Sequence, residues 1–220
     1  HPSIRSFTLQ RPQIRATDAK SIAPQLPLEG TVFGYRLLGS WGFAAYRDMG
    51  RDFVAWQAEA AKAGPKAAVV PGLIMSDWWM GAVKAGSMSS MWTMWFIKFA
   101  QARGLFTLYG NFGGDLAMNV NWLEPGEHYA GTRGKPRSDS TLVRWWRDEY
   151  ALMPAQPTLL DWDGSVVPDS SSAARPAADF AALVNALRFV TPKHSGAFPG
   201  LIIINSGYVD MTLSWLCNTA

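Results

Sequence analysis

Apolar residues recur at helical spacing between residues 47 and 65. Four of them, three or four positions apart, would share one face of a helix: Met49, Phe53, Trp56 and Ala60. Gly64 and Pro65 follow at once and form a strong stop signal. The pattern therefore predicts an amphipathic helix that ends before Gly64.

Short apolar runs bounded by turn residues predict strands, and longer periodic segments predict further helices. The expected strands are 31–40, 66–75, the run after Pro157 and 199–207, together with 105–115, which reads as a strand that leads into a Gly-rich loop. The expected further helices are 140–150 and 175–190. Strands and helices that alternate along a chain are typical of α/β layering. We therefore predict an α/β fold with a mixed or parallel sheet and flanking amphipathic helices. The 157–207 stretch is long enough for one parallel crossover unit.

Residues 1–30 contain four prolines and show no sustained periodicity, so they are expected to form an extended N-terminal arm. Residues 31–220 would form a single domain, with a sub-boundary in the polar connection 124–140. The first twenty residues hold four basic side chains and one acid, which is typical of the basic, acid-poor segments of matrix-targeted proteins. A solvated basic tail is the alternative. The predicted interface residues of this arm are Arg5, Arg11 and Arg15.

The segment 76–104 has two tryptophan pairs at its ends, Trp78 with Trp79 and Trp92 with Trp95. Aromatic residues at both ends of a helix can form interfacial belts in a membrane. However, Lys84 and several serines dilute the apolar character, and a spanning helix needs about 20 predominantly apolar residues. A buried or protein-binding helix is favoured, because tryptophan and methionine are enriched at protein interfaces. Membrane contact through 76–104 remains the alternative.

The composition also favours a partner-covered surface. Apolar residues make up 48% of the chain and charged residues 17%, against about 25% charged residues in an average soluble domain. The net charge of +3 is too small to indicate nucleic-acid binding. Cys217 is the single cysteine and the three histidines are scattered, so no internal disulfide and no metal-ligand spacing is expected. The sequence therefore indicates no cofactor.

One motif suggests catalysis. The stretch TLLDWDGSVV, residues 158–167, resembles the first motif of haloacid dehalogenase-like phosphohydrolases, in which an apolar strand ends in Asp-x-Asp-Gly-Thr/Ser. The resemblance implies Asp161 as nucleophile, Asp163 as general acid/base and a bound Mg²⁺ ion, with Ser206 of LIIINSG as a phosphate ligand. The remaining family residues would have to come from upstream, from Lys98 and Asp115, in a permuted order. The alternative is a strand that ends in an Asp-Gly turn, where aspartate side chains bond the local backbone.

Together these patterns favour a non-catalytic, accessory structural subunit of a larger assembly, with other protein subunits as its partners. A mitochondrial complex at the inner membrane is the first expectation. A magnesium-dependent phosphohydrolase and a virus coat protein are the alternatives.

Overall fold

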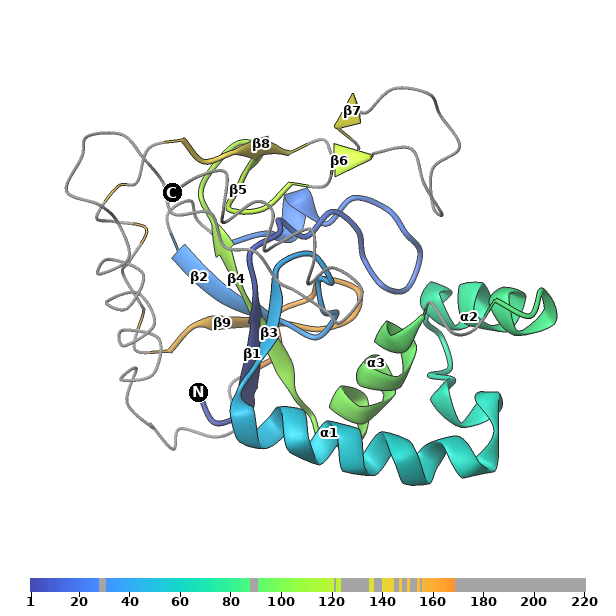
Figure 1. Cartoon of the computed structure of the whole chain (residues 1–220). Coiled ribbons are helices and arrows are strands. Elements are labelled where there is room, and N and C mark those ends of the chain that lie inside the picture. Colours follow the sequence, from blue (N-terminus) through green and yellow to red (C-terminus); the bar gives the residue numbers. More distant parts are fainter. Residues whose placement is uncertain are drawn as a thin grey trace, which may run out of the picture.

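The computed structural model describes residues 1–27, 31–87, 91–120 and 156–168, with the short pieces 122–123, 135–136, 140–144, 147, 150 and 154. Within this part of the chain, five strands form one mixed sheet in the order β3-β1-β4-β2-β9 (Figure 1). Neighbours β1/β4 and β2/β9 are parallel, whereas β1/β3 and β2/β4 are antiparallel. The predicted α/β fold is confirmed. The strands are β1 (Ile4–Thr8), β2 (Thr31–Tyr35), β3 (Phe43–Ala45), β4 (Phe106–Asn111) and β9 (Thr158–Leu160).

Strand β4 is the centre of the sheet, and its side chains are buried on both faces. Phe106 and Leu108 contribute to an apolar cluster on one face, while Tyr109 contributes to the main core on the other. Alternate side chains of a strand point to opposite faces, so a strand buried on both sides reads as a nearly continuous apolar run. This explains why the run starting at Leu105 could be predicted as a strand.

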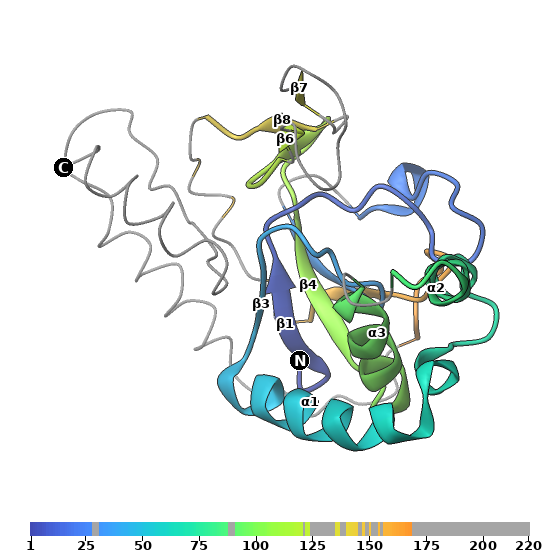
Figure 2. The same ribbon diagram turned by 45° about the vertical axis from the view of Figure 1, so that its right-hand side comes forward.

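Three helices contribute to the main core. They are α1 (Arg47–Ala60), α2 (Ile74–Lys84) and α3 (Trp92–Ala102), and Figure 2 shows α2 and α3 on one side of the sheet with α1 crossing its lower end. Helix α1 confirms the predicted amphipathic helix. It continues into the 3₁₀ turn Ala61–Ala63 and stops at Gly64, whose φ of 84° is easily reached by glycine.

Contacts between aromatic rings join the three helices to each other. Phe53 of α1 meets Phe96 and Phe99 of α3 edge-on, with ring centroids 5.1 and 5.5 Å apart. Trp95 of α3 contacts both Trp56 of α1 and Trp79 of α2. Edge-to-face pairs of this kind add to the stabilisation from burial alone, so α3 holds the other two helices in place.

The predicted N-terminal arm is not confirmed. Residues 4–8 form β1, which lies inside the sheet between β3 and β4. Further along the same segment, Ala16 and Ile22 are fully buried in the main core. The prolines misled the prediction, because Pro2 lies in the turn before β1 and Pro24 lies in the 3₁₀ helix Ala23–Gln25 rather than in a free tail. The first 27 residues are therefore part of the domain.

Two further segments differ from the expectation. Residues 66–75 form no strand, since Pro65–Ala68 is a 3₁₀ helix and α2 begins at Ile74. Residues 76–104 contribute to two helices, α2 and α3, rather than one. None of the helices that the structure describes is long and apolar enough to cross a bilayer.

The remaining described strands are short. Strand β5 (Leu116–Ala117) pairs in parallel with β8 (Thr141–Leu142), and β6 (Trp122–Leu123) pairs with β7 (Lys135–Pro136). The start of the predicted helix 140–150 is therefore strand, and Leu142 is exposed there while Val143 is buried. The predicted helix 175–190, the predicted strand 199–207 and most of the connection 124–140 lie outside the described residues.

Candidate functional site

The motif Asp161–Ser165, called the aspartate turn below, follows directly after β9. The amide of Gly164 donates to the carbonyl oxygen of Asp161 at 2.8 Å, and the amide of Asp161 donates to the carbonyl oxygen of Ser165 at 2.8 Å. The chain then folds back along β9, with Val166 bridged to Leu160. The turn therefore closes a tight hairpin on the outer edge of β9.

The residue types fit this hairpin well. A type I turn favours aspartate at its first position and glycine at its fourth, which are Asp161 and Gly164 here. In three-residue hairpin loops a glycine in the left-handed region follows the turn and forms a bulge, and Gly164 has φ 85°. The sequence Asp-Trp-Asp-Gly-Ser is thus explained by local backbone geometry.

The carboxylate of Asp161 is held by an arginine that directly follows the neighbouring strand, β2. Nε of Arg36 lies 2.7 Å from Oδ1 of Asp161, and the same oxygen accepts a hydrogen bond from the amide of Trp162 at 2.9 Å. The guanidinium of Arg36 also lies over the ring of Phe106, 4.4 Å from its centroid. This arrangement ties the turn to the end of β2. Sequence reasoning missed Arg36, because the pairing of β2 with β9 is not visible in the sequence.

The carboxylate of Asp163 points back into its own turn. Its Oδ1 accepts hydrogen bonds from the Ser165 hydroxyl at 2.6 Å and the Ser165 amide at 2.9 Å. These hydrogen bonds, that from the hydroxyl first, hold the pKa of Asp163 below its usual range. Asp163 therefore acts as a turn-closing side chain, as in the local alternative that the sequence left open.

The other residues of the phosphohydrolase hypothesis do not gather here. Tyr35 pairs with both Leu160 and Thr107, while Thr31 pairs with Asn111. Asp115 follows Asn111 and thus lies beyond the opposite end of the sheet, roughly 13 Å or more away at about 3.3 Å per residue.

Lys98 lies on α3 and its Nζ is 3.3 Å from Oε1 of Gln101. Among the described residues, no group of three or more acidic, histidine or cysteine side chains could hold a metal ion. Ser206 lies outside the described residues.

The tryptophans predicted to form an interface fall into two groups. Trp79 is 1% exposed, contacts Trp95, and donates from Nε1 to the carbonyl oxygen of Pro65 at 2.7 Å. Trp95 is partly buried against the same core. In contrast, Trp78 is 49% exposed and Trp92 is 44% exposed. The structure therefore places Trp79 in the chain's own core, and leaves Trp78 and Trp92 accessible.

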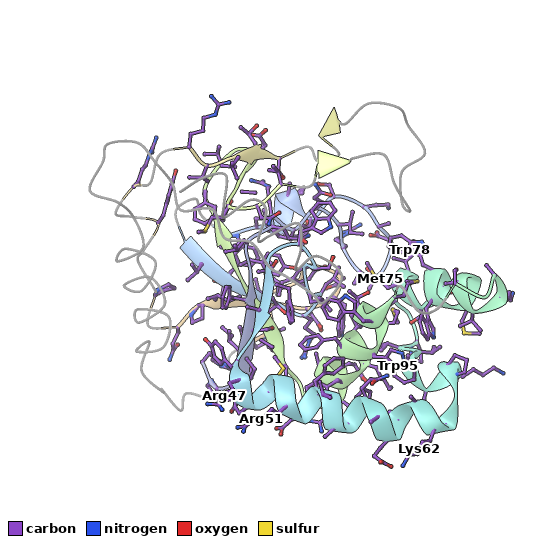
Figure 3. The ribbon with its side chains drawn as sticks, viewed as in Figure 1. Arg47, Arg51, Lys62, Met75, Trp78 and Trp95 are labelled. Carbon is purple, nitrogen blue, oxygen red and sulfur yellow. The ribbon has the colours of Figure 1, made fainter. Side chains whose placement is uncertain are left out.

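Figure 3 shows Trp78 and Met75 near the beginning of α2, with Trp95 below them on α3. Trp92 is the first residue of α3, and its ring packs against Phe43, 5.7 Å away. Both exposed tryptophans thus lie on helices that contribute to the main core. The exposed side of α2 that carries Trp78 is called the tryptophan surface below.

The three arginines predicted for the arm have different surroundings. Arg5 forms an ion pair with Asp48 of α1, and Arg15 forms one with Asp18. Within the described part of the chain, Nη1 of Arg11 is buried and has no hydrogen-bond partner. Two of the three guanidinium groups are thus paired within the chain.

Comparisons with known proteins return no match: no family model, no curated protein and no solved structure is similar to this chain. The residues of the molecule therefore carry the functional argument.

Proposed function

We propose that this chain is a non-catalytic subunit of a larger protein assembly, and that it binds a neighbouring subunit through the tryptophan surface. The observation that carries the proposal is the exposure of about half of Trp78 on a helix whose opposite face is fixed in the core. Tryptophan is the residue type most often found at the energetic centre of interfaces.

The charge distribution supports the same surface. The exposed side of α1 and the turn after it alternates in charge, with Arg47, Asp48, Arg51, Asp52, Glu59 and Lys62, and Figure 3 shows Arg47 and Arg51 at one end of the helix and Lys62 at the other. On α2 the exposed positions are Asp77, Trp78, Gly81 and Lys84. Interfaces are depleted in charged residues at their centre and enriched in aromatic ones. Trp78 supplies the aromatic part of that composition on α2, with Asp77 and Lys84 as the charged positions of the same helix. The outer face of α1 carries more charges, which suits solvent.

The aspartate turn supports the non-catalytic part of the proposal. Both carboxylates are used within the fold, Asp161 by Arg36 and Asp163 by Ser165. Lys98 and Asp115, which the phosphohydrolase hypothesis also needs, lie on α3 and after the end of β4, in other parts of the chain. The geometry therefore favours a structural turn over the phosphohydrolase alternative. The mitochondrial inner-membrane location stays a prediction from the sequence.

The test is site-specific photo-crosslinking of the full chain in its native extract. A photoreactive aromatic residue at position 78 should give one discrete, reproducible crosslinked protein of higher mass. The matched control is the same residue at position 54, since Val54 is 65% exposed on α1, and it should give none. Equal labelling at both positions, or none at 78, would refute the proposed surface.

A further inference from the structure

The backbone of Ala16 joins two segments that are far apart in sequence. Its amide donates to the carbonyl oxygen of Trp162 in the aspartate turn at 2.8 Å, and its carbonyl oxygen accepts from the amide of Ile74 at 2.9 Å. Ile74 is the first residue of α2. The backbone of one buried residue therefore links the aspartate turn to the helix that carries Trp78.

The link matters because α2 has no side-chain cap among the described residues. The first four amides of a helix have no partner within the helix and must be satisfied from outside. Leu73 precedes the helix and cannot cap it through its side chain. The carbonyl oxygen of Ala16 thus supplies an external partner for the first of these amides.

Ala16 belongs to a small hairpin, residues 13–22, called the strap below. The amide of Arg15 donates to the carbonyl oxygen of Lys20 at 2.8 Å, the amide of Ile22 donates to that of Gln13 at 3.1 Å, and Ile14 is bridged to Ser21. Ala16 and Ile22 therefore belong to one hydrogen-bonded hairpin.

The hydroxyl of Tyr35 fixes the strap to the aspartate turn. It accepts from the amide of Ala16 at 3.1 Å, and its O–H group faces two acceptors, the carbonyl oxygens of Ile14 at 3.1 Å and Trp162 at 3.2 Å. Tyr35 is fully buried. Losing a buried partner of this kind is costly, because the groups left behind are desolvated and unsatisfied.

A second contact lies at Gly164. A Cβ atom there would be 3.1 Å from Cγ of Gln25 and 3.4 Å from Cγ1 of Ile22. The strap and the short helix after it thus pack closely on the aspartate turn at a point separate from Tyr35.

From these contacts we infer that the strap, the aspartate turn and the first turn of α2 open and close together as one cooperative unit. The strap is the control element for the tryptophan surface: when it lifts, the first turn of α2 loses its partner at Ala16, and Trp78, one turn along, loses its fixed position. The aspartate turn is then the anchor of this strap. The regulatory meaning rests on the proposed function, whereas the cooperative opening does not depend on it.

The first test is native-state hydrogen exchange of the unmodified full chain over a series of low denaturant concentrations. Amides that open in one unit share one opening free energy and one denaturant slope. The amides of Ala16, Ile22 and Ile74 should therefore converge on common values, below those of the β2/β4 ladder. A different slope for Ile74 than for Ala16 would overturn the inference.

The second test is Tyr35→Phe, with Tyr109→Phe as the matched control. Both hydroxyls are buried, but that of Tyr109 donates to the carbonyl oxygen of Leu37 at 2.8 Å, away from the strap. Tyr35→Phe should accelerate exchange at Ala16 and Ile74 by the same factor, on the order of tenfold for a lost hydrogen bond. Tyr109→Phe should not accelerate exchange at Ala16 and Ile74 more than at other amides.

Acceleration at Ala16 alone in Tyr35→Phe would contradict the coupling. If that variant does not fold, the denaturant series on the unmodified chain still decides. Both experiments use the isolated chain, so a failure here leaves the crosslinking result at position 78 untouched, and a negative crosslinking result leaves the cooperative unit intact.

Discussion

Helices α1 and α2 both pack into the main core but present different outer faces. Met49 of α1 and Trp79 of α2 are both buried in the main core. Outwards, α1 shows alternating charges, whereas the exposed positions of α2 include Trp78. Burial fixes the inner residues of a helix through packing, while its outer residues are free to suit solvent or a partner. Met49 and Trp79 therefore stabilise the fold, whereas the exposed residues of each helix are accessible to solvent or to a partner.

The two helices also depend on the N-terminal segment in different ways. The start of α1 is tied to β1, where the amide of Tyr46 donates to the carbonyl oxygen of Arg5 and Arg5 pairs with Asp48. The start of α2 is tied to the strap through Ala16. One segment, residues 1–27, thus supports both helices at separate points. Removing this segment should therefore affect both helices.

Deleting residues 1–27 should therefore have the largest effect and prevent folding. The deletion removes β1 from the interior of the sheet and takes Ala16 and Ile22 out of the core. Circular dichroism and the dispersion of amide NMR signals would show the loss. A truncated chain that still unfolds cooperatively would mean that this segment is an arm after all.

Trp79→Ala should destabilise the chain by roughly 3–5 kcal/mol, as expected for truncating a large buried aromatic side chain. The matched substitution Trp78→Ala, one position along, should cost less than about 1 kcal/mol, because that side chain is half exposed. Denaturant unfolding monitored by circular dichroism would give both values. Similar losses for the two variants would place Trp78 in the core and remove the tryptophan surface.

Arg36→Ala should cost about 1 kcal/mol or less. The ion pair with Asp161 is partly exposed to solvent, and pairs of this kind contribute little, although the contact with the Phe106 ring adds to it. Asp161→Asn should cost no more, because asparagine also suits the first position of the turn. A loss of several kcal/mol in Asp161→Asn would show that this carboxylate does more than close a turn.

The smallest effect should appear at acid pH on α1. The amide of Met49, and then the guanidinium of Arg5, hold the pKa of Asp48 below its usual range. A carboxyl group with a lower pKa in the folded state stabilises the fold above its unfolded pKa of about 3.9, and this contribution is lost as pH falls through the folded pKa. Asp48→Asn should therefore flatten the dependence of unfolding free energy on pH below about pH 4. Asp52→Asn, on the same exposed side, is the control, and an equal flattening there would contradict the assignment to Asp48.

Much of the local structure could be predicted from the sequence where the apolar periodicity and the stop signals indicated a single type of element. The helix at 47–60 and the strands β2, β4 and β9 were anticipated, because their periodicity and stop signals agree. The segments 1–30 and 66–75 were not, since the same prolines and apolar residues suit an arm, a turn or a strand until tertiary contacts decide. At 158–167 the sequence left two interpretations open, and the side-chain contacts of Asp161 and Asp163 favour the turn.

The different environments of Trp78 and Trp79 also needed the structure. Adjacent residues on a helix lie about 100° apart, so one can face the core while the other faces outward. The available signal was the spacing of Met75 and Trp79, which lie one turn apart and are both buried. Because Trp78 and Trp79 are adjacent and both aromatic, the sequence did not show which of the two faces the core. Arg36 and Tyr35 were missed because their roles depend on the pairing of β2 with β9.

The central claim is that α2 presents a partner-binding surface, and the most direct measurement is the native mass of the full chain in its own extract, unmodified and with Trp78→Ser. The account predicts a large complex that dissociates to a folded species near 24.2 kDa in Trp78→Ser and stays intact in Val54→Ser. An unmodified chain that already runs near 24.2 kDa, or a complex that Trp78→Ser leaves unchanged, would contradict it.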